Sequence, residues 1–362
     1  MHILHVVGAR PNFMKAAPVL RALAAHPEVR QTLVHTGQHY DRVMSEVFFS
    51  QLEMPHPDCN LEVGSGTHGQ QTAAVMVALE PILLERKPDL VVVYGDVNST
   101  LAAALVSSKL QVPLAHVEAG LRAADRTMPE EINRLLTDQI SDLLFTPSTD
   151  ADENLRREGI PASKIHFVGN VMIDSLVRLL PRADAHFHAS ISSPYALVTL
   201  HRPSNVDDLP WLRDLLTALS DLSKHLTVVF PVHPRTRQRL QDLGTRFATG
   251  KRIEFCDPFP YLEFIALQKR AAMVITDSGG IQEETTFLGV PCLTVRENTE
   301  RPITISKGTN RLVGRDLGHL RSAAEEILQN GKQQSLAATS IPLWDGHAAE
   351  RIARFVVRGS TS

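Results

Sequence analysis

The chain has 362 residues, of which 43% are hydrophobic and only 5% aromatic, which suits two domains packed mainly by aliphatic side chains. Its 37 Lys and Arg against 40 Asp and Glu give a formal net charge of −3. That balance disfavours nucleic-acid binding, because a phosphate backbone requires a concentrated basic surface. Any anionic ligand must therefore be met by a few placed groups.

Cysteine and histidine spacing gives no metal signature. Cys59, Cys256 and Cys292 are far apart, and none forms a CxxC pair. For His186 and His188 an ordinary surface loop is favoured over a metal site. The apolar stretch at the N-terminus is too short for a signal peptide, and no run of about 18 apolar residues occurs. We expect a cytoplasmic protein without a metal site or a membrane span.

Short β-branched runs alternate with longer amphipathic stretches, which is typical of βαβ units around a parallel sheet. The strands expected in the first half are Ile3–Val7, Thr32–His35, Leu90–Tyr94, Leu114–Val117, Leu143–Phe145 and Ile165–Val168. The helices expected there are Met14–Ala25, Gln70–Arg86, Asn98–Leu110 and one that opens at Pro129.

The stretch Pro181–Pro194 interrupts this periodicity, so we expect it to connect two halves. The strands expected in the second half are Ala196–Leu200, Leu226–Pro231, Ile253–Cys256, Met273–Thr276 and Cys292–Val295, followed by helices near Leu320–Gln329 and Ala348–Val357. We predict two domains, 1–175 and 176–345, with a C-terminal helix at about 346–362 packing back on the first.

Residues of catalytic type follow six of these strands. Ligands of open parallel sheets bind beyond the carboxyl ends of the strands, which is where these residues lie. They are Arg10 and Lys15, Asp96, Glu118, His201 and Arg202, His233, and the run Asp277-Ser278-Gly279-Gly280. Each one alone is more simply a loop or cap residue, but six such strand ends together indicate a shared cleft.

The stretch DSGGIQEE at 277–284 is the most informative. It follows a strand and opens a helix, where paired glycines allow close approach and free N–H groups suit a diphosphate. Glu284 is placed to accept hydrogen bonds from ribose hydroxyls, and Phe264 is available to stack on a uracil. A plain glycine turn with acidic first-turn residues is the alternative, but nucleotide binding is favoured. The first strand lacks the GxGxxG turn of a dinucleotide site.

Three carboxylates of the first half, on Asp96, Glu118 and Glu130, suit proton transfer to and from sugar carbons and hydroxyls. Two simpler interpretations stay open: Asp96 as the cap of the helix at Asn98, and Glu130 as an ordinary surface partner of Arg134 at i,i+4. The cations that would offset the charge of a departing diphosphate are Arg10, Lys15, His201 and Arg202.

A series of motifs, in this order, resembles the non-hydrolysing UDP-N-acetylglucosamine 2-epimerases. They are GARPNFMK, TGQHYD, GDVNST, HVEAGLR, MPEEINR, GNVMID, HRPSN, PVHPR, DSGGIQEE and ENTERP, and they run from Gly8 to about Gly314. The resemblance implies a GT-B-like α/β fold, with two Rossmann-like parallel-sheet domains and an interdomain cleft. It also implies a homodimer that needs no metal or NAD and takes a UDP-sugar.

The implied reaction is the reversible conversion of UDP-GlcNAc to UDP-ManNAc, by elimination of UDP through a 2-acetamidoglucal and re-addition. Carried over by motif, the reaction centre is lined by Arg10, Lys15, Asp96, Glu118, Glu130 and His201. The UDP would be held by Phe264, Ser278, Gly279, Gly280, Glu284 and Arg301. We also expect Arg134, Arg202 and His233 to contact the substrate.

The chain departs from the family pattern in the region where some relatives bind a second, activating UDP-GlcNAc, beside Gln38 and His39. HRPSN replaces the His-Arg-Arg-Glu of many bacterial members, and Ala74 stands where an arginine is usual. We therefore predict weak or absent activation. The alternative functions are a hydrolysing relative, an epimerase of UDP-2,3-diacetamido-glucuronate, a GT-B glycosyltransferase and a nucleotide-sugar sensor; GNVMID and HRPSN favour UDP-GlcNAc over the diacetamido sugar.

Overall fold

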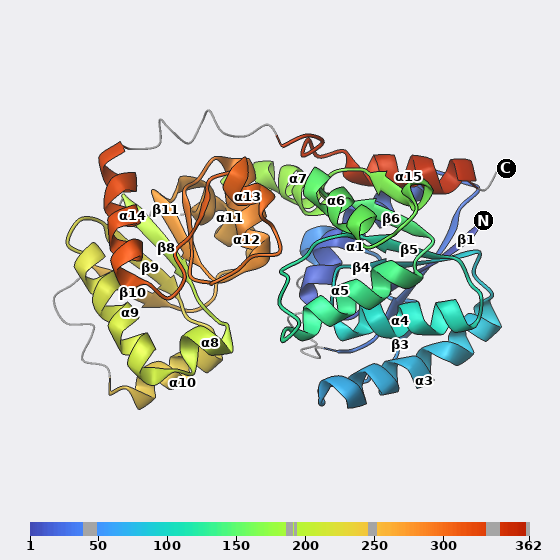
Figure 1. The fold of residues 1–362 in the computed structure, drawn as a ribbon, viewed down its shortest axis with the longest axis horizontal. Helices are drawn as coiled ribbons and strands as arrows, with labels where there is room; N and C mark the ends of the chain where they lie inside the picture. Colours follow the sequence, from blue (N-terminus) through green and yellow to red (C-terminus); the bar gives the residue numbers. More distant parts are fainter. Residues whose placement is uncertain (39–48, 186–190, 192–193, 245–251, 331–340, 360–362) are drawn as a thin grey trace. The chain divides into compact units, whose positions relative to one another are not determined.

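The computed structural model describes residues 1–38, 49–185, 191, 194–244, 252–330 and 341–359. The chain divides into two compact α/β units, one formed by 1–178 with 342–362 and the other by 179–341 (Figure 1). In the described part, no helix is both long enough and apolar enough to span a bilayer.

The described part of the first unit contains a seven-stranded parallel sheet in the order β3-β2-β1-β4-β5-β6-β7. Its strands are β1 His2–Val7, β2 Arg30–His35, β3 Cys59–Asn60, β4 Leu90–Tyr94, β5 Leu114–Val117, β6 Leu143–Thr146 and β7 Ile165–Phe167. The direction in which strands are added reverses between β1 and β4, which lie side by side. This reversal creates a switch point, where open α/β sheets bind their ligands.

Helices cover this sheet on both faces, and the central strands are accordingly buried along their whole length. They are α1 Arg10–Ala24, α3 His68–Arg86, α4 Asn98–Lys109, α5 Pro129–Ile140, α6 Thr149–Arg157, the start of α7 Val171–Ala185, and α15 Ala348–Gly359 (Figure 1). On one face Val91 and Val93 of β4 pack with Leu79 and Leu83 of α3.

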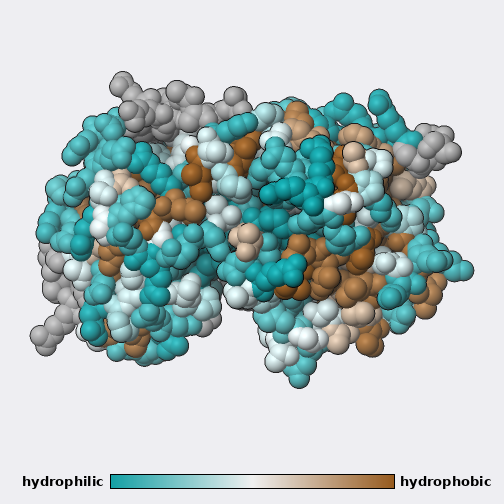
Figure 2. Space-filling view, in the orientation of Figure 1, coloured by the Kyte–Doolittle hydropathy of each residue, from teal (hydrophilic) through white to brown (hydrophobic). Residues whose placement is uncertain are grey.

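The surface of this unit carries exposed apolar side chains on two helices that flank α4. Val77 and Leu84 lie on α3, and Ile132 and Leu136 lie on α5. Figure 2 shows hydrophobic residues gathered over these helices. We call these four side chains the α3–α5 face.

The described part of the second unit holds six parallel strands in the order β10-β9-β8-β11-β12-β13, with a second switch point between β8 and β11. The strands are β8 Tyr195–Thr199, β9 Thr227–Pro231, β10 Ile253–Cys256, β11 Met273–Thr276, β12 Cys292–Thr294 and β13 Asn310–Leu312. The helices are α8 Pro203–Val206, α9 Leu209–Leu222, α10 Pro234–Asp242, α11 Tyr261–Arg270, α12 Gly279–Leu288, α13 Ile303–Ser306 and α14 Leu317–Asn330.

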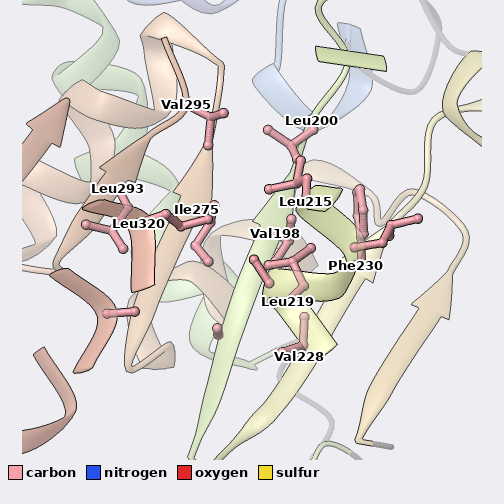
Figure 3. Packing of buried hydrophobic residues seen from close by; sticks show 14 of the residues in the cluster. Val198, Leu200, Leu215, Leu219, Val228, Phe230, Ile275, Leu293, Val295 and Leu320 are labelled. Carbon is pink, nitrogen blue, oxygen red and sulfur yellow. The ribbon is translucent and has the colours of Figure 1, made fainter. Parts of the chain in front are cut away.

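Aliphatic side chains from the strands and from two helices fill the core of the second unit (Figure 3). Val198 of β8 and Ile275 of β11 belong to one buried cluster with Leu215 and Leu219 of α9 and Leu320 of α14. This packing fixes the strand ends that carry the motifs of the second half.

The fold class predicted from the sequence is confirmed. Every expected strand is present, with ends within two residues of the prediction, and β3 and β13 are short additions that were not predicted. The connection between the two halves was predicted to begin at Pro181. This start is wrong, because α7 continues through Pro181 to Ala185. Leu176, Leu179 and Ala183 stay buried at helical spacing across the proline, so packing outweighs the hydrogen bond that proline removes. His186 and His188 lie outside the described residues.

The last helix belongs to the first unit. The carboxylate of Asp174 in α7 accepts hydrogen bonds from the N–H groups of Ala348 (3.1 Å) and Ala349 (2.7 Å), which open α15. The indole N–H of Trp344 donates to the carbonyl of Pro147 at 2.9 Å. The chain therefore returns to the first unit after completing the second.

Candidate active site

A buried ion pair lies at the switch point of the first unit. The Lys15 ammonium contacts the Glu118 carboxylate, and the two side chains are 5% and 3% exposed. Gly95, directly after β4, has φ +61°, and a Cβ there would lie 2.5 Å from Lys15 Nζ and 3.1 Å from Glu118 Oε2. Glycine is therefore required both by the backbone conformation and by the space that the ion pair fills.

The backbone of Glu118 is in the left-handed region, with φ +73°. For a non-glycine residue this conformation costs about 1–2 kcal/mol. The N–H groups of Glu118 and Ala119 both donate to the carbonyl of Phe145, at 3.0 and 3.1 Å, and hold the turn. Such strain concentrates at functional sites, and here it is found at the residue whose carboxylate meets Lys15.

Asp96 is bound by a buried arginine. Arg134 Nη1 lies 2.5 Å from Asp96 Oδ2, and the Arg134 side chain is only 2% exposed. Both simpler interpretations are therefore wrong. The N-cap residue of α4 is Val97, and the helix shows no cap hydrogen bond from its N-cap side chain. Arg134 is buried, so it is not half of an ordinary surface pair.

Glu131, which sequence reasoning did not single out, is the buried carboxylate of α5. It pairs with Arg134 at 2.6 Å and accepts hydrogen bonds from the N–H groups of Ala123 (3.0 Å) and Ala124 (2.9 Å). Its neighbour Glu130, predicted to be catalytic, is exposed in the first turn of the same helix. Glu131 thus holds both Arg134 and the loop before α5.

The predicted effector residues have different outcomes. Gln38 is buried, and its side-chain oxygen accepts hydrogen bonds from the N–H (3.1 Å) and the hydroxyl (2.7 Å) of Ser99 in α4. His39 lies outside the described residues, and Ala74 is exposed on α3. The side chain of Gln38 therefore fixes the start of α4.

Arg10, which was predicted to contact the substrate, is the first residue of α1.

Asp277 organises the loop after β8 in the second unit. Its fully buried carboxylate accepts hydrogen bonds from the N–H groups of His201 (3.1 Å) and Arg202 (2.9 Å) and from the Asn205 amide (3.1 Å). The His201 ring lies 3.1 Å from the same carboxylate and is 48% exposed. Asp277 thus places the predicted catalytic histidine. The sequence showed it only as the first letter of DSGG.

The N-terminus of α12 presents a glycine turn. Ser278 is the N-cap residue, Gly279 and Gly280 open the helix, and no described side chain caps it. A Cβ on Gly279 would meet the Glu300 carboxylate at 2.5 Å and also collide with the Arg301 guanidinium. The Arg301 side chain is buried between Glu300 and Glu283. Arg301 therefore packs against this glycine turn.

Glu284 is buried one turn into α12. Burial raises its pKa to about 7, against a partial lowering by a hydrogen bond from Tyr261. The Tyr261 hydroxyl donates to Glu284 Oε1 at 2.6 Å. Phe264 is half-buried on α11 and packs against a hydrophobic cluster, and His233 is exposed before α10. In the described residues no group of three or more His, Cys, Asp or Glu could hold a metal ion.

Two parallel-sheet α/β units, each with chemistry-bearing residues at its switch point, define a GT-B-like protein. The motifs GARPNFMK and GDVNST follow β1 and β4, and HRPSN and DSGGIQEE follow β8 and β11. The chain belongs to the UDP-N-acetylglucosamine 2-epimerase family, whose model matches residues 21–357. It is therefore an isomerase of the epimerase class, as its motifs predicted.

Relatives match over nearly the full length. The UDP-N-acetylglucosamine 2-epimerase of Methanocaldococcus jannaschii is 43% identical, with 99% of this chain and 100% of the relative covered. A crystal structure of the M. jannaschii enzyme in complex with UDP-GlcNAc and UDP superposes with a TM-score of 0.90 at 42% identity, over 99% of this chain and 100% of that one. The UDP-2,3-diacetamido-2,3-dideoxy-D-glucuronate 2-epimerase of Pseudomonas aeruginosa is also 43% identical, with the same coverage.

Proposed function

We propose that this protein interconverts UDP-GlcNAc and UDP-ManNAc by eliminating UDP from C1 and adding it back. The observation that carries the proposal is the cluster at the switch point of the first unit. There Glu118 pairs with Lys15, and Asp96 pairs with buried Arg134. Two carboxylates held by separate cations supply the acid and base that an epimerisation requires.

The reaction requires proton transfer on both faces of the sugar. The C2 proton is not next to a carbonyl, so removal alone would leave an unstabilised carbanion. Loss of UDP from C1 in the same step gives a neutral 2-acetamidoglucal: a carboxylate takes the C2 proton, the C1–O bond breaks and a C1–C2 double bond forms. Re-addition returns a proton to the opposite face and re-forms the C1–O bond. Asp96, Glu118 and Glu130 are the proposed acid–base groups.

The second unit supplies the nucleotide-binding groups of the proposal. The N–H groups of Gly279 and Gly280 at the start of α12 suit the diphosphate. Glu284 is the proposed acceptor for the ribose hydroxyls, and Phe264 the platform for the uracil. His201 and Arg202, held by Asp277, would offset the charge of the departing UDP.

A second substrate is favoured by one specific observation. The Pseudomonas aeruginosa relative, named for UDP-2,3-diacetamido-2,3-dideoxy-D-glucuronate, is as similar to this chain as the Methanocaldococcus jannaschii relative. Both substrates share the UDP and the C2 acetamido group, so the same elimination serves either. We propose UDP-GlcNAc as the substrate on the GNVMID and HRPSN motifs, with a cytoplasmic homodimer as the working form.

The test is proton NMR of the purified protein with UDP-GlcNAc in deuterated water, without added cofactor. UDP-ManNAc carrying deuterium at C2 is the expected product. Free ManNAc with UDP would instead indicate a hydrolysing enzyme. Turnover of the diacetamido-glucuronate alone would change the substrate, and no reaction with either would refute the proposal.

Two glutamate variants complete this experiment. Glu118→Gln removes the proposed acid–base group and is expected to lower kcat by about 10²–10⁴-fold. Glu62→Gln is the matched control, because Glu62 also has a left-handed backbone, with φ +52°, but is exposed. Its kcat is expected to equal that of the unmodified protein.

A further inference from the structure

The turn that carries Asp96 is held by side chains from several other elements. The carbonyl of Tyr94 accepts hydrogen bonds from the Asn12 amide of α1 (2.7 Å) and from the Thr100 hydroxyl of α4 (2.8 Å). The carbonyl of Asp96 accepts one from the Asn133 amide of α5 (2.8 Å). The backbone on both sides of Gly95 is therefore fixed from outside the turn.

The carbonyl of Gly95 itself is held by a buried histidine. His116 of β5 places Nε2 at 2.7 Å from the Gly95 oxygen and Nδ1 at 2.6 Å from Asp138 Oδ1. A carbonyl oxygen only accepts hydrogen bonds, so Nε2 carries a proton. Asp138 is fully buried, and although burial raises its pKa, His116 and Arg122 hold the pKa below the ordinary value. The Asp138 carboxylate is therefore the partner that holds the ring at Nδ1.

The same carboxylate also fixes the loop after Glu118. The second oxygen of Asp138 accepts the N–H of Gly120 at 3.1 Å and pairs with Arg122 at 2.8 Å. Arg122 in turn binds Glu158 through two hydrogen bonds of 2.7 and 2.6 Å. One buried pair thus connects the backbone before Asp96 to the backbone after Glu118.

We propose that His116, held by Asp138, is a positioning residue that sets the places of the Asp96 and Glu118 carboxylates through the Gly95 carbonyl. The Gly95 peptide leads directly into Asp96. Gly95 lies directly against the Lys15–Glu118 pair, because a Cβ added to it would touch both members. Rotation of the Gly95 peptide therefore changes the space around both side chains. His116 itself is fully buried, which leaves it no contact with the sugar. This inference rests on the proposed function of the two carboxylates.

Two amide substitutions test the two hydrogen bonds of His116 one at a time. The Asn amide nitrogen lies as many bonds from Cβ as Nδ1 does, and the Gln amide nitrogen as many as Nε2 does. His116→Gln therefore keeps the donor to the Gly95 carbonyl, whereas His116→Asn keeps only the donor to Asp138. Since misplacement by about 1 Å costs on the order of 100-fold in rate, we expect kcat to fall about 100-fold in His116→Asn and less than about tenfold in His116→Gln.

The affinity for UDP distinguishes a loss of carboxylate positioning from general damage to the fold. Calorimetric affinity for UDP, which we assign to the second unit, is expected to be unchanged in both variants. KM is expected to change much less than kcat. Equal kcat losses in the two variants, or no loss in either, would overturn the inference. An unmodified protein that does not epimerise would instead refute the proposed function.

Asp138→Asn is the second variant, for the case that neither His116 variant folds. Its amide can donate to Nδ1 of a neutral ring, which leaves the Nε2 proton to bind the Gly95 carbonyl. We expect kcat within about tenfold of the unmodified protein. A loss near 100-fold would show that the buried charge, and not the bond to Gly95, supports activity, and the inference would fall.

Discussion

At the scale of single residues, the buried surroundings of Glu284 disfavour the charged form of its carboxyl group. Burial raises the pKa of this carboxyl from an ordinary 4.5 to about 7, although the Tyr261 hydroxyl donates a hydrogen bond to it. A folded state with the higher pKa binds more protons than the unfolded state between these values. Stability is therefore lost as the pH rises from about 4.5 through 7. A role in ligand binding would explain why a carboxylate is present at a position where burial disfavours its charge.

Glu284→Gln is expected to stabilise the protein and weaken UDP binding. Removal of the opposed charge should raise the free energy of unfolding at pH 8 by up to about 3 kcal/mol, with a much smaller gain at pH 4.5. Loss of a charged acceptor for the ribose should lower UDP affinity about tenfold or more.

Thermal or denaturant unfolding at both pH values and calorimetry with UDP measure the two effects of this change. Glu325→Gln, at an exposed position of α14, is the control and should alter neither. A Glu284→Gln protein that binds UDP as tightly as the unmodified protein would contradict the ribose assignment.

Adjacent residues differ in ways that the sequence alone did not separate. Glu130 and Glu131 are both glutamates in the first turn of α5, yet Glu130 is exposed and Glu131 is buried against Arg134. Consecutive helical residues point about 100° apart, so only one of the two could face the sheet. Which one faces it depends on how α5 packs on its neighbours.

At the scale of elements, Gly95 joins the end of β4 to Asp96, in the proposed reaction centre. Gly95→Ala should combine two costs: about 1 kcal/mol for an alanine in the left-handed region, and displacement of Lys15 by the new Cβ. Gly159→Ala is a matched control, because Gly159 has φ +82° and a Cβ added there would meet no atom within 4 Å.

Both glycine variants are expected to lose similar stability from backbone strain, measured by denaturant unfolding, with the larger loss in Gly95→Ala. Only Gly95→Ala is expected to lose activity, by about 100-fold or more in kcat, since it disturbs the Lys15–Glu118 pair. Equal activity in the two variants would show that the space at Gly95 does not matter for the reaction.

The elements were largely predictable, because apolar runs and helical spacing are local properties of the sequence. The strands and the residues directly after them were found in this way. Local rules failed where packing outweighed them: Pro181 was expected to end helical structure, yet α7 continues through it. The strands β3 and β13, of 2 and 3 residues, are too short to produce a periodic pattern.

At the scale of the whole molecule, the predicted homodimer needs a surface on which a second copy can pack. The α3–α5 face of the first unit offers exposed Val77, Leu84, Ile132 and Leu136, and Val77 is 74% exposed. Exposed apolar side chains that gather on one side of a protein mark interaction sites. We therefore expect self-association through this face.

Val77→Lys is expected to shift the protein from dimer to monomer in analytical ultracentrifugation, because a buried, unpaired ammonium opposes association. Ile305→Lys, on α13 of the second unit and 39% exposed, is the control and should leave the dimer unchanged. A Val77→Lys protein that sediments as a dimer, or an unmodified protein that sediments as a monomer, would contradict the assignment.

The order of strands and helices, the two-sheet fold class, the family motifs and the strand ends at which charged residues gather were all predictable from the amino-acid sequence. These follow from spacing and from residue type, which are properties of neighbours along the chain. Three further features became visible only in the folded chain: His116 meets Asp138 and Gly95, Glu131 and Asp277 are buried, and Arg301 packs against the glycine turn that opens α12. Each of these depends on burial and on contacts between residues distant in sequence, and such contacts exist only after the sheets and helices have packed.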